Sequence, residues 1–191
     1  MMIRFIFILI PFFVFAQNKD YTPYNNKGLS FKVQSFNLFY SYDGKPTYNT
    51  DFELNETSRI VGFQGEVNYF VSKYFAFGLG IGGEKLTQPE VKYYPAYTNF
   101  LAVFYNKKNS MYFKFNLGTH LGNLDKKGNF YRTGIGYRIR AYKNSIINIE
   151  GTYSNHFFYK KFQSSGRPVD AYSFDMLGIT LGIEFNKFNN D

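Results

Sequence analysis

The chain has 191 residues, with 22 Lys and Arg against 14 Asp and Glu, a formal net charge of +8, two His and no Cys. This length suits one domain. The absence of Cys excludes a disulfide framework, and so few thiol and imidazole groups give no reason to expect a metal or another cofactor. A basic charge often indicates nucleic-acid binding, but here Lys and Arg are scattered without a basic stripe, so nucleic acid is not an expected partner.

The N-terminal segment differs from the rest of the chain. Arg4 precedes an apolar run over residues 5–15, and Val14, Phe15 and Ala16 form a cleavage site before Gln17. This is the pattern of a secretory signal peptide, which is too short to cross a bilayer as a helix. We therefore expect residues 1–16 to be removed on export and residues 17–191 to form one domain.

A hairpin over residues 129–158 shows the clearest structural pattern. From Tyr131 to Ala141 the odd-numbered residues are mostly apolar or aromatic, whereas the even-numbered residues are Arg or Gly. After a break at residues 143–145 the alternation resumes. A period of two indicates strands. Two runs of about twelve residues exceed the usual strand length and are long enough to cross a bilayer at a tilt.

The same alternation predicts eight strands in all. They are residues 28–40, 59–71, 75–84, 97–105 and 111–121, the two strands of the hairpin, and residues 171–185. Long connections (41–58, 85–96, 122–128 and 159–170) alternate with short turns. In an up-and-down barrel this puts all short turns and both termini at one end, as in outer-membrane barrels. The predicted fold class is all-β: an eight-stranded antiparallel up-and-down transmembrane β-barrel.

Two observations indicate which face of the strands points inward. The apolar faces hold on the order of 35 bulky side chains, more than the interior of an eight-stranded barrel accommodates. The polar faces are rich in Gly, which weakens a water-facing strand but makes room inside a narrow barrel. We therefore expect the apolar face to contact lipid and the polar face to line the lumen.

The predicted signal peptide, the eight amphipathic strands, the alternating connections and the closing run from Leu177 to Phe185 resemble the small outer-membrane barrels of the OmpA and OmpX type. The Phe15-Ala16-Gln17 cleavage site and the abundance of Phe, Tyr, Asn and Lys resemble barrel proteins of the Bacteroidota. The resemblance implies a protein of a Gram-negative outer membrane, inserted by the barrel assembly machinery and surrounded by outer-membrane lipids, including lipopolysaccharide. The chain departs from the pattern because six residues follow Phe185, whereas many such barrels end on the aromatic residue.

The inward faces are predicted to carry a network of charged side chains. Its members are the bases Lys32, Lys114, Arg132, Arg138 and Arg140 and the acids Glu66, Glu84, Glu150 and Glu184. Buried charges must be paired and hydrogen-bonded. We expect these groups to form a salt-bridged filling that closes the lumen. The alternative is a small gated channel or porin.

An enzymatic alternative depends on Glu150, Ser154 and His156, which share one strand face. Such a set could serve an acyl hydrolase, and the lipid A deacylases are eight-stranded barrels. In that family His precedes Ser by two residues, whereas here Ser154 precedes His156. The three side chains would also face the lumen, away from a lipid substrate. A lipid A-modifying enzyme is therefore the less favoured alternative, and the expected function is not enzymatic.

Two of the predicted loops carry opposite charges. The acidic first loop contains Asp43, Asp51, Glu53 and Glu56, and the basic fourth loop contains Lys160, Lys161 and Arg167. Loops on a rigid scaffold are common binding sites. The expected function is a structural role or loop-mediated binding of a protein or polysaccharide partner at the cell surface. Ordinary solvated loops are the other interpretation.

The parity of the faces predicts strand register. Directly paired residues must share a face, which predicts a three-residue turn at Lys143-Asn144-Ser145 with a left-handed Asn144 or Ser145. The pairs across that hairpin would be Arg132–His156, Arg138–Glu150 and Arg140–Asn148. The same rule at residues 72–74 predicts the pairs Gly62–Glu84, Glu66–Gly80 and Asn68–Gly78.

The parity changes within the first and last strands. Phe36 and Leu38 are out of phase with Phe31, and Phe174 is out of phase with Leu177. We expect a β-bulge in each strand, and the alternative is regular strands with an aromatic plug in the lumen. Aromatic residues near strand ends are expected to include an interfacial girdle. The candidates are Tyr69, Tyr74, Tyr97, Tyr105, Tyr131, Tyr137 and Tyr153.

Overall fold

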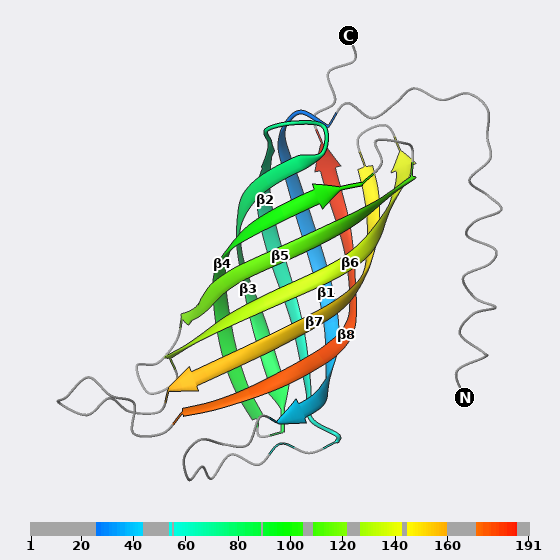
Figure 1. Cartoon of the computed structure of the whole chain (residues 1–191). Coiled ribbons are helices and arrows are strands. Elements are labelled where there is room, and N and C mark those ends of the chain that lie inside the picture. The colour runs from blue at the N-terminus through cyan, green and yellow to red at the C-terminus, as the bar shows by residue number, and fades with distance from the viewer. Residues whose placement is uncertain are drawn as a thin grey trace, which may run out of the picture.

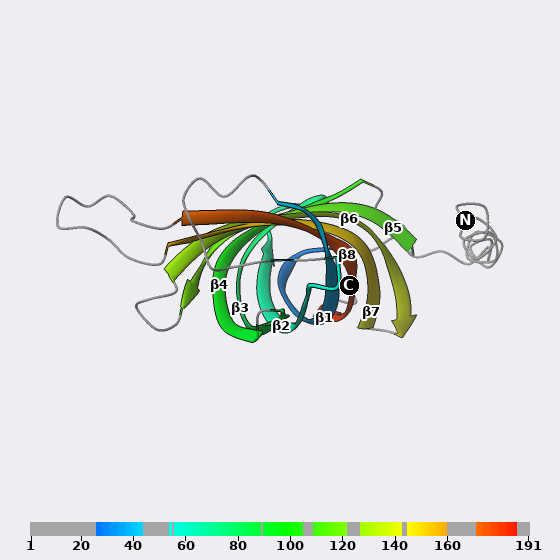
Figure 2. The same ribbon diagram turned by 90° about the horizontal axis from the view of Figure 1, so that it is seen from below.

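The protein is an eight-stranded closed barrel, as the sequence predicts (Figure 1). The computed structural model describes residues 26–43, 54, 56–88, 90–104, 109–121, 127–142, 145–159 and 171–186. The strands are β1 (Gly28–Asp43), β2 (Arg59–Phe70), β3 (Phe75–Thr87), β4 (Glu90–Val103), β5 (Asn109–Leu121), β6 (Lys127–Tyr142), β7 (Ser145–Tyr159) and β8 (Ala171–Asn186). Each pairs antiparallel with its neighbours in sequence, and β8 closes the barrel on β1 (Figure 2).

The two ends of the barrel differ. The ends of β2, β4, β6 and β8 lie at one end of the barrel with the starts of the other four strands, and we call this the turn end. The ends of β1, β3, β5 and β7 lie at the opposite end with the starts of β2, β4, β6 and β8, and we call this the loop end (Figure 1). Among the described residues, no helix is long and apolar enough to cross a membrane.

The predicted loop over residues 85–96 is wrong, because most of it extends β3 and β4. β4 begins at Glu90, and its inward-facing Val91 and Tyr93 are buried while Lys92 is exposed. Pro95 hid this alternation from sequence reasoning. The β3–β4 ladder pairs Ile81 with Ala96 and next pairs Glu84 with Tyr93. The interrupted stretch includes Pro95, which has no N–H to donate to a ladder.

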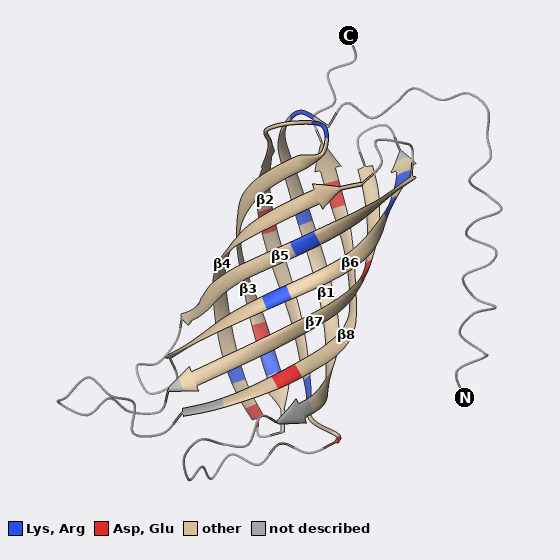
Figure 3. Cartoon of the chain, viewed as in Figure 1, with Lys and Arg blue, Asp and Glu red and all other residues tan. Residues whose placement is uncertain are grey.

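The inside and outside of the barrel carry the predicted residue types. On the outer wall Leu79 and Ile81 are 67% and 68% exposed, whereas Lys114 and Arg132 inside are 1% exposed. Figure 3 shows charged positions along the strands as well as at their ends. This arrangement is the reverse of a water-soluble barrel and is typical of one whose outer wall faces lipid.

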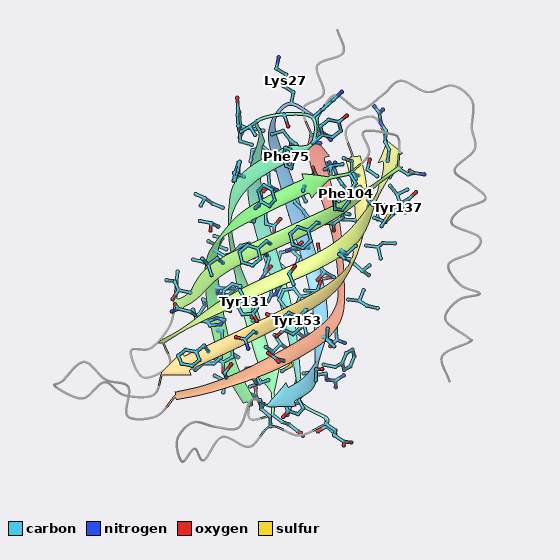
Figure 4. The ribbon with its side chains drawn as sticks, in the orientation of Figure 1. Lys27, Phe75, Phe104, Tyr131, Tyr137 and Tyr153 are labelled. Carbon is cyan, nitrogen blue, oxygen red and sulfur yellow. The ribbon has the colours of Figure 1, made fainter. Side chains whose placement is uncertain are left out.

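Aromatic side chains lie near both ends of the outer wall. Phe75, Phe104 and Tyr137 lie toward the turn end, and Tyr131 and Tyr153 lie closer to the loop end (Figure 4). Tyr69 and Tyr74 are also exposed, in agreement with the predicted girdle. Tyr97 does not belong to it: this residue is mid-strand in β4 and faces inward, with 5% of its surface exposed. Tyr105 lies outside the described residues.

The register is predicted correctly for one hairpin and wrongly for another. Across β2–β3, Gly62 pairs with Glu84, Glu66 with Gly80 and Asn68 with Gly78, as predicted. Across β6–β7, the predicted pairs are wrong by two residues. The observed pairs are Arg132–Ser154, Gly136–Glu150, Arg138–Asn148 and Arg140–Ile146.

The β6–β7 turn explains this error. Tyr142 pairs with Ser145, and a register shift between Arg140 and Tyr142 then restores the parity that a two-residue connection would break. The predicted three-residue turn is therefore wrong, because Ser145 already belongs to β7. Lys143 and Asn144 lie outside the described residues, within which no residue other than Gly has a positive φ.

The bulges predicted to switch parity in the first and last strands are absent from the described ladders. β8 pairs with β7 without a shift from Ala171 to Phe185, and β1 pairs with both neighbours without a shift up to Phe39. The one irregularity lies later, between Tyr40 and Tyr42. Phe36 and Phe174 consequently face inward, with 5% and 1% exposed. The alternative of an aromatic plug is thus confirmed.

Because β8 keeps its phase, Asp175 faces outward. Its carboxylate accepts hydrogen bonds from the Tyr153 hydroxyl at 2.9 Å and from Asn155 Nδ2 at 2.6 Å. Asn155 also donates to Ser173 Oγ at 3.0 Å. These donors compensate the carboxylate on the outer wall, where a bare charge at the bilayer midplane would be costly.

Inward and outward Gly positions should tolerate a methyl group very differently. A Cβ at inward Gly178 would clash with the main-chain oxygen of Asn37, whereas a Cβ at outward Gly83 would have nothing within 4 Å. We expect Gly178→Ala to lower the free energy of unfolding by about 1–3 kcal/mol. Gly83→Ala should change it by less than about 0.5 kcal/mol. Urea unfolding of the refolded barrel in detergent measures both, and equal stabilities would contradict the assigned faces.

Candidate functional site

The lumen gathers nearly all of the charged residues that the sequence predicts for it. Among the described residues it holds four cations and four carboxylates, none more than 4% exposed. These are Lys32, Lys114, Arg132 and Arg138 with Glu66, Glu84, Glu150 and Glu184. Their formal charges cancel. The ninth predicted member, Arg140, is partly exposed near the end of β6 and lies outside this buried group.

Two lysines and two glutamates form the centre of the network. Lys114 Nζ lies 3.2 Å from Glu66 Oε1 and 3.5 Å from Glu150 Oε2. Lys32 Nζ lies 4.0 Å from the same Glu150 oxygen. Lys114 also donates a hydrogen bond to Gln34 Oε1 at 3.0 Å. One ammonium therefore joins two carboxylates, so the four charged groups act as one unit rather than as isolated pairs.

Neutral donors complete the coordination of these carboxylates. Tyr97 donates its hydroxyl to Glu66 at 2.9 Å, and Tyr112 donates to Glu150 at 2.8 Å. Thr152 donates to the second oxygen of Glu150 at 3.0 Å. A buried ion pair is tolerated when further hydrogen bonds satisfy the remaining lone pairs. Sequence reasoning missed both tyrosines: Tyr97 was assigned to the girdle, and Tyr112 was overlooked although it shares the parity of the inward Lys114.

An arginine–glutamate pair lies on either side of this centre. Arg132 Nη2 contacts Glu84 Oε1 at 2.9 Å, and Gln64 donates to the same oxygen at 2.8 Å. Arg138 Nη2 contacts Glu184 Oε1 at 2.8 Å. The predicted Arg138–Glu150 pair is therefore wrong. In the observed register, two residues from the predicted one, Asn148 rather than Glu150 lies opposite Arg138.

An aromatic plug follows the charged network toward the loop end. We use this name for the buried cluster of Phe36, Leu38, Ile60, Leu86, Val91, Tyr93, Phe158, Phe174 and Met176. The rings of Tyr93 and Phe158 stack at 4.6 Å between centroids, and those of Phe158 and Phe174 at 5.8 Å. The guanidinium of Arg132 lies 4.4 Å from the centroid of the Phe36 ring, so the charged network and the plug are in contact.

Two histidines connect the plug to the charged network. His120 Nε2 lies 3.1 Å from His156 Nδ1, and His156 Nε2 lies 2.8 Å from Ser154 Oγ. Glu150 instead bonds to Tyr112 and Thr152, so the hypothetical Ser/His/Glu set does not assemble. Ser154 and His156 are fully buried. Among the described residues no cluster of three or more His, Asp or Glu could hold a metal ion.

The candidate loop contacts can be located only in part. Asp51, Glu53, Lys160, Lys161 and Arg167 lie outside the described residues. Asp43 is the last residue of β1, at the loop end, and its side chain is also outside them. Their role as binding residues stays a prediction.

The arrangement fills the interior of the barrel with paired charges and stacked rings. An ion crossing the barrel would have to separate the Lys32, Lys114, Glu66 and Glu150 cluster and then displace rings that are 5% exposed or less. With its closed ladder and apolar outer wall, the protein has the architecture of the small outer-membrane β-barrels.

Solved structures of this class are similar to the chain in fold. Neisserial surface protein A (NspA) has 11% sequence identity and a TM-score of 0.53, covering 87% of this chain and 99% of that one. OprG from Pseudomonas aeruginosa has 9% identity and a TM-score of 0.49, covering 84% and 96%. The N-terminal barrel domain of Pseudomonas aeruginosa OprF has 14% identity and a TM-score of 0.45, covering 82% and 97%. At such identities the likeness concerns the fold alone. No family model and no curated protein matches the sequence.

Breaking one buried ion pair should destabilise the barrel more than removing both partners. Glu184→Leu leaves the guanidinium of Arg138, 1% exposed, without its carboxylate. We expect a loss of about 3–5 kcal/mol, because a buried charge is left uncompensated. The double variant Arg138→Met with Glu184→Leu should recover most of this loss. Urea unfolding of the wild type, the two single variants and the double variant gives the coupling energy between Arg138 and Glu184. Additive losses of stability would show that the two side chains do not interact.

Proposed function

We propose that the protein is a non-enzymatic integral barrel of a Gram-negative outer membrane that supports loop-mediated binding at the cell surface. In this account residues 1–16 direct export and are removed, the barrel assembly machinery inserts the mature chain, and the lumen conducts neither ions nor solutes. The barrel serves as a rigid support, and the partner is a protein or polysaccharide that contacts the connections at the loop end.

The filled lumen is the observation that carries this proposal. Four cations and four carboxylates with balanced charge, none more than 4% exposed, favour a closed interior. The alternative of a gated channel would require the network joined through Lys114 to open, although that ammonium contacts two carboxylates within 3.5 Å. The plug would have to move as well.

The enzymatic alternative finds less support in the geometry. Ser154 and His156 are in hydrogen-bond contact, but both are fully buried within the lumen. A lipid substrate would reach the outer wall, on the other side of the sheet from these side chains. Non-enzymatic binding therefore agrees better with where the polar groups lie.

The first test concerns the membrane. With its apolar outer wall the mature protein should stay in the membrane pellet when membranes of expressing cells are extracted with alkaline carbonate. A soluble periplasmic protein made in the same cells is the control that should be released. Recovery of the barrel in the soluble fraction would contradict an integral membrane protein.

The second test distinguishes a closed barrel that only supports its loops from a gated channel. Refolded protein added to a planar lipid bilayer should produce no discrete current steps, because the paired charges and the plug fill its lumen. A bacterial porin refolded in the same detergent shows that the assay detects insertion and conduction. Reproducible current steps from the wild-type barrel would favour the channel.

A third test concerns the enzymatic alternative. Mass spectra of lipid A from expressing cells should be unchanged, whereas modified lipid A would favour a lipid A-modifying enzyme.

A further inference from the structure

Three basic residues gather on the outer wall of β2–β4 at the loop end. Lys85 and Lys92 are directly opposite each other across the β3–β4 pair, and both side chains face outward. Arg59 is exposed at the start of β2, where its main chain bonds to Thr87 Oγ1 of β3. Figure 3 shows basic segments of β3 and β4 near the loop end. Like charges directly opposite each other destabilise a sheet, and a bound anion would relieve this repulsion.

One carboxylate lies beside these cations. Glu90 Oε1 is 2.6 Å from Lys85 Nζ, with 64% and 43% of the two side chains exposed. Water screens such an exposed pair, which is therefore weak. The group of Arg59, Lys85, Lys92 and Glu90 retains a net positive charge.

The two lysines border a hollow of about 310 Å³ in the outer wall, which extends from them toward the turn end. Its outward-facing lining consists of Val61, Phe63, Gly83, Lys85, Lys92 and Tyr94. The hollow exists because Gly83, opposite Phe63 in the ladder, has no side chain. A Cβ there would meet no atom within 4 Å, so the main-chain packing does not require glycine at this position.

A second, larger hollow lies farther along β4 toward the turn end. Its volume is about 580 Å³, and its outward-facing lining is Phe77, Leu79, Thr98, Phe100, Phe115 and Leu117. The short side chain of Thr98 forms its floor, because Thr98 lies between Leu79 and Leu117, which are 67% and 57% exposed. Between the two hollows the outer face of β4 carries only Ala96. The outer wall along β4 thus carries two shallow, mainly apolar hollows in a row, with cations at the loop end of the first, and we call this row the groove.

We propose that this surface is a binding site for one phosphorylated glycolipid of the outer leaflet. The lysines bind a lipid phosphate, and an acyl chain lies in the groove along β4. The inference rests on the proposed outer-membrane function, in which the loop end faces the cell exterior. Basic side chains at a membrane surface attract anionic head groups, and apolar hollows below them suit acyl chains rather than a soluble anion or a polar protein surface.

The decisive test measures lipid A binding by native mass spectrometry on the barrel refolded in a maltoside detergent. We expect Lys85→Gln with Lys92→Gln to weaken binding roughly 30-fold at low salt, since each cation near a membrane surface contributes about as much as a 5-fold change in affinity. The matched control is Lys27→Gln with Lys73→Gln, which removes the same charge from exposed lysines at the turn end and should leave binding unchanged.

Two further variants separate the phosphate site from the groove. Glu90→Gln removes the carboxylate beside Lys85 and should strengthen binding several-fold, an effect that loss of folding would not produce. Gly83→Leu fills the hollow and should weaken binding while the barrel stays folded. Dephosphorylated lipid A should bind the wild type as weakly as lipid A binds the double lysine variant.

The outcomes separate this inference from the proposed function. Equal binding by the two double variants, or equal binding of lipid A and its dephosphorylated form, would overturn the lipid site. If the barrel resists carbonate extraction but the lysine variants bind lipid A like the controls, the lipid site is wrong and the proposed integral membrane barrel is unaffected. Release by carbonate would instead contradict the proposed function itself.

Discussion

Space inside a narrow barrel is the constraint on which the rest of this structure depends. The interior accommodates long charged and aromatic side chains because glycines lie beside them. A Cβ at Gly134 would meet the carboxylate of Glu150, one at Gly80 the ring of Tyr97, and one at Gly136 the ring of Tyr112. These three neighbours are one of the two carboxylates of the central network and two of its three hydroxyl donors. The inward glycines therefore leave the space in which these polar groups meet.

The sequence was sufficient for the architecture and for the composition of the lumen. A period of two is a strong signal over strands of 12 to 16 residues, so strand number, closure and the inward face of Lys32, Glu66 and Arg132 could be predicted. The β2–β3 pairs were also predicted correctly, because no register shift interrupts the ladder after the short turn. Eight of the nine predicted lumen charges are buried together, because the period of two correctly assigns them to the inward face.

The remaining features depend on details that parity does not determine. Parity allows registers that differ by two residues, so the shift between Arg140 and Tyr142 moved Glu150 away from Arg138. The phase change at Phe36 and Phe174 indicated a bulge, but large rings fill the interior of a regular barrel equally well. Pro95 hid the first half of β4 and with it Tyr93, Lys92 and the outer groove. Which charges meet across the lumen depends on the register of every ladder around the barrel, and parity leaves that register open by two residues.

The β7–β8 ladder keeps one phase from end to end, so that Phe158 and Phe174 face a lumen without water access at the plug. The chain has no Trp, so single Trp substitutions report their own surroundings. The indole fluorescence of Leu177→Trp or Ile179→Trp should be quenched by lipids with brominated acyl chains. The fluorescence of Phe174→Trp or Phe158→Trp should be quenched by neither these lipids nor aqueous iodide. Quenching of the Phe174→Trp variant by brominated lipids would place that position on the outer wall, and quenching by iodide would show an open lumen; either result would contradict the account.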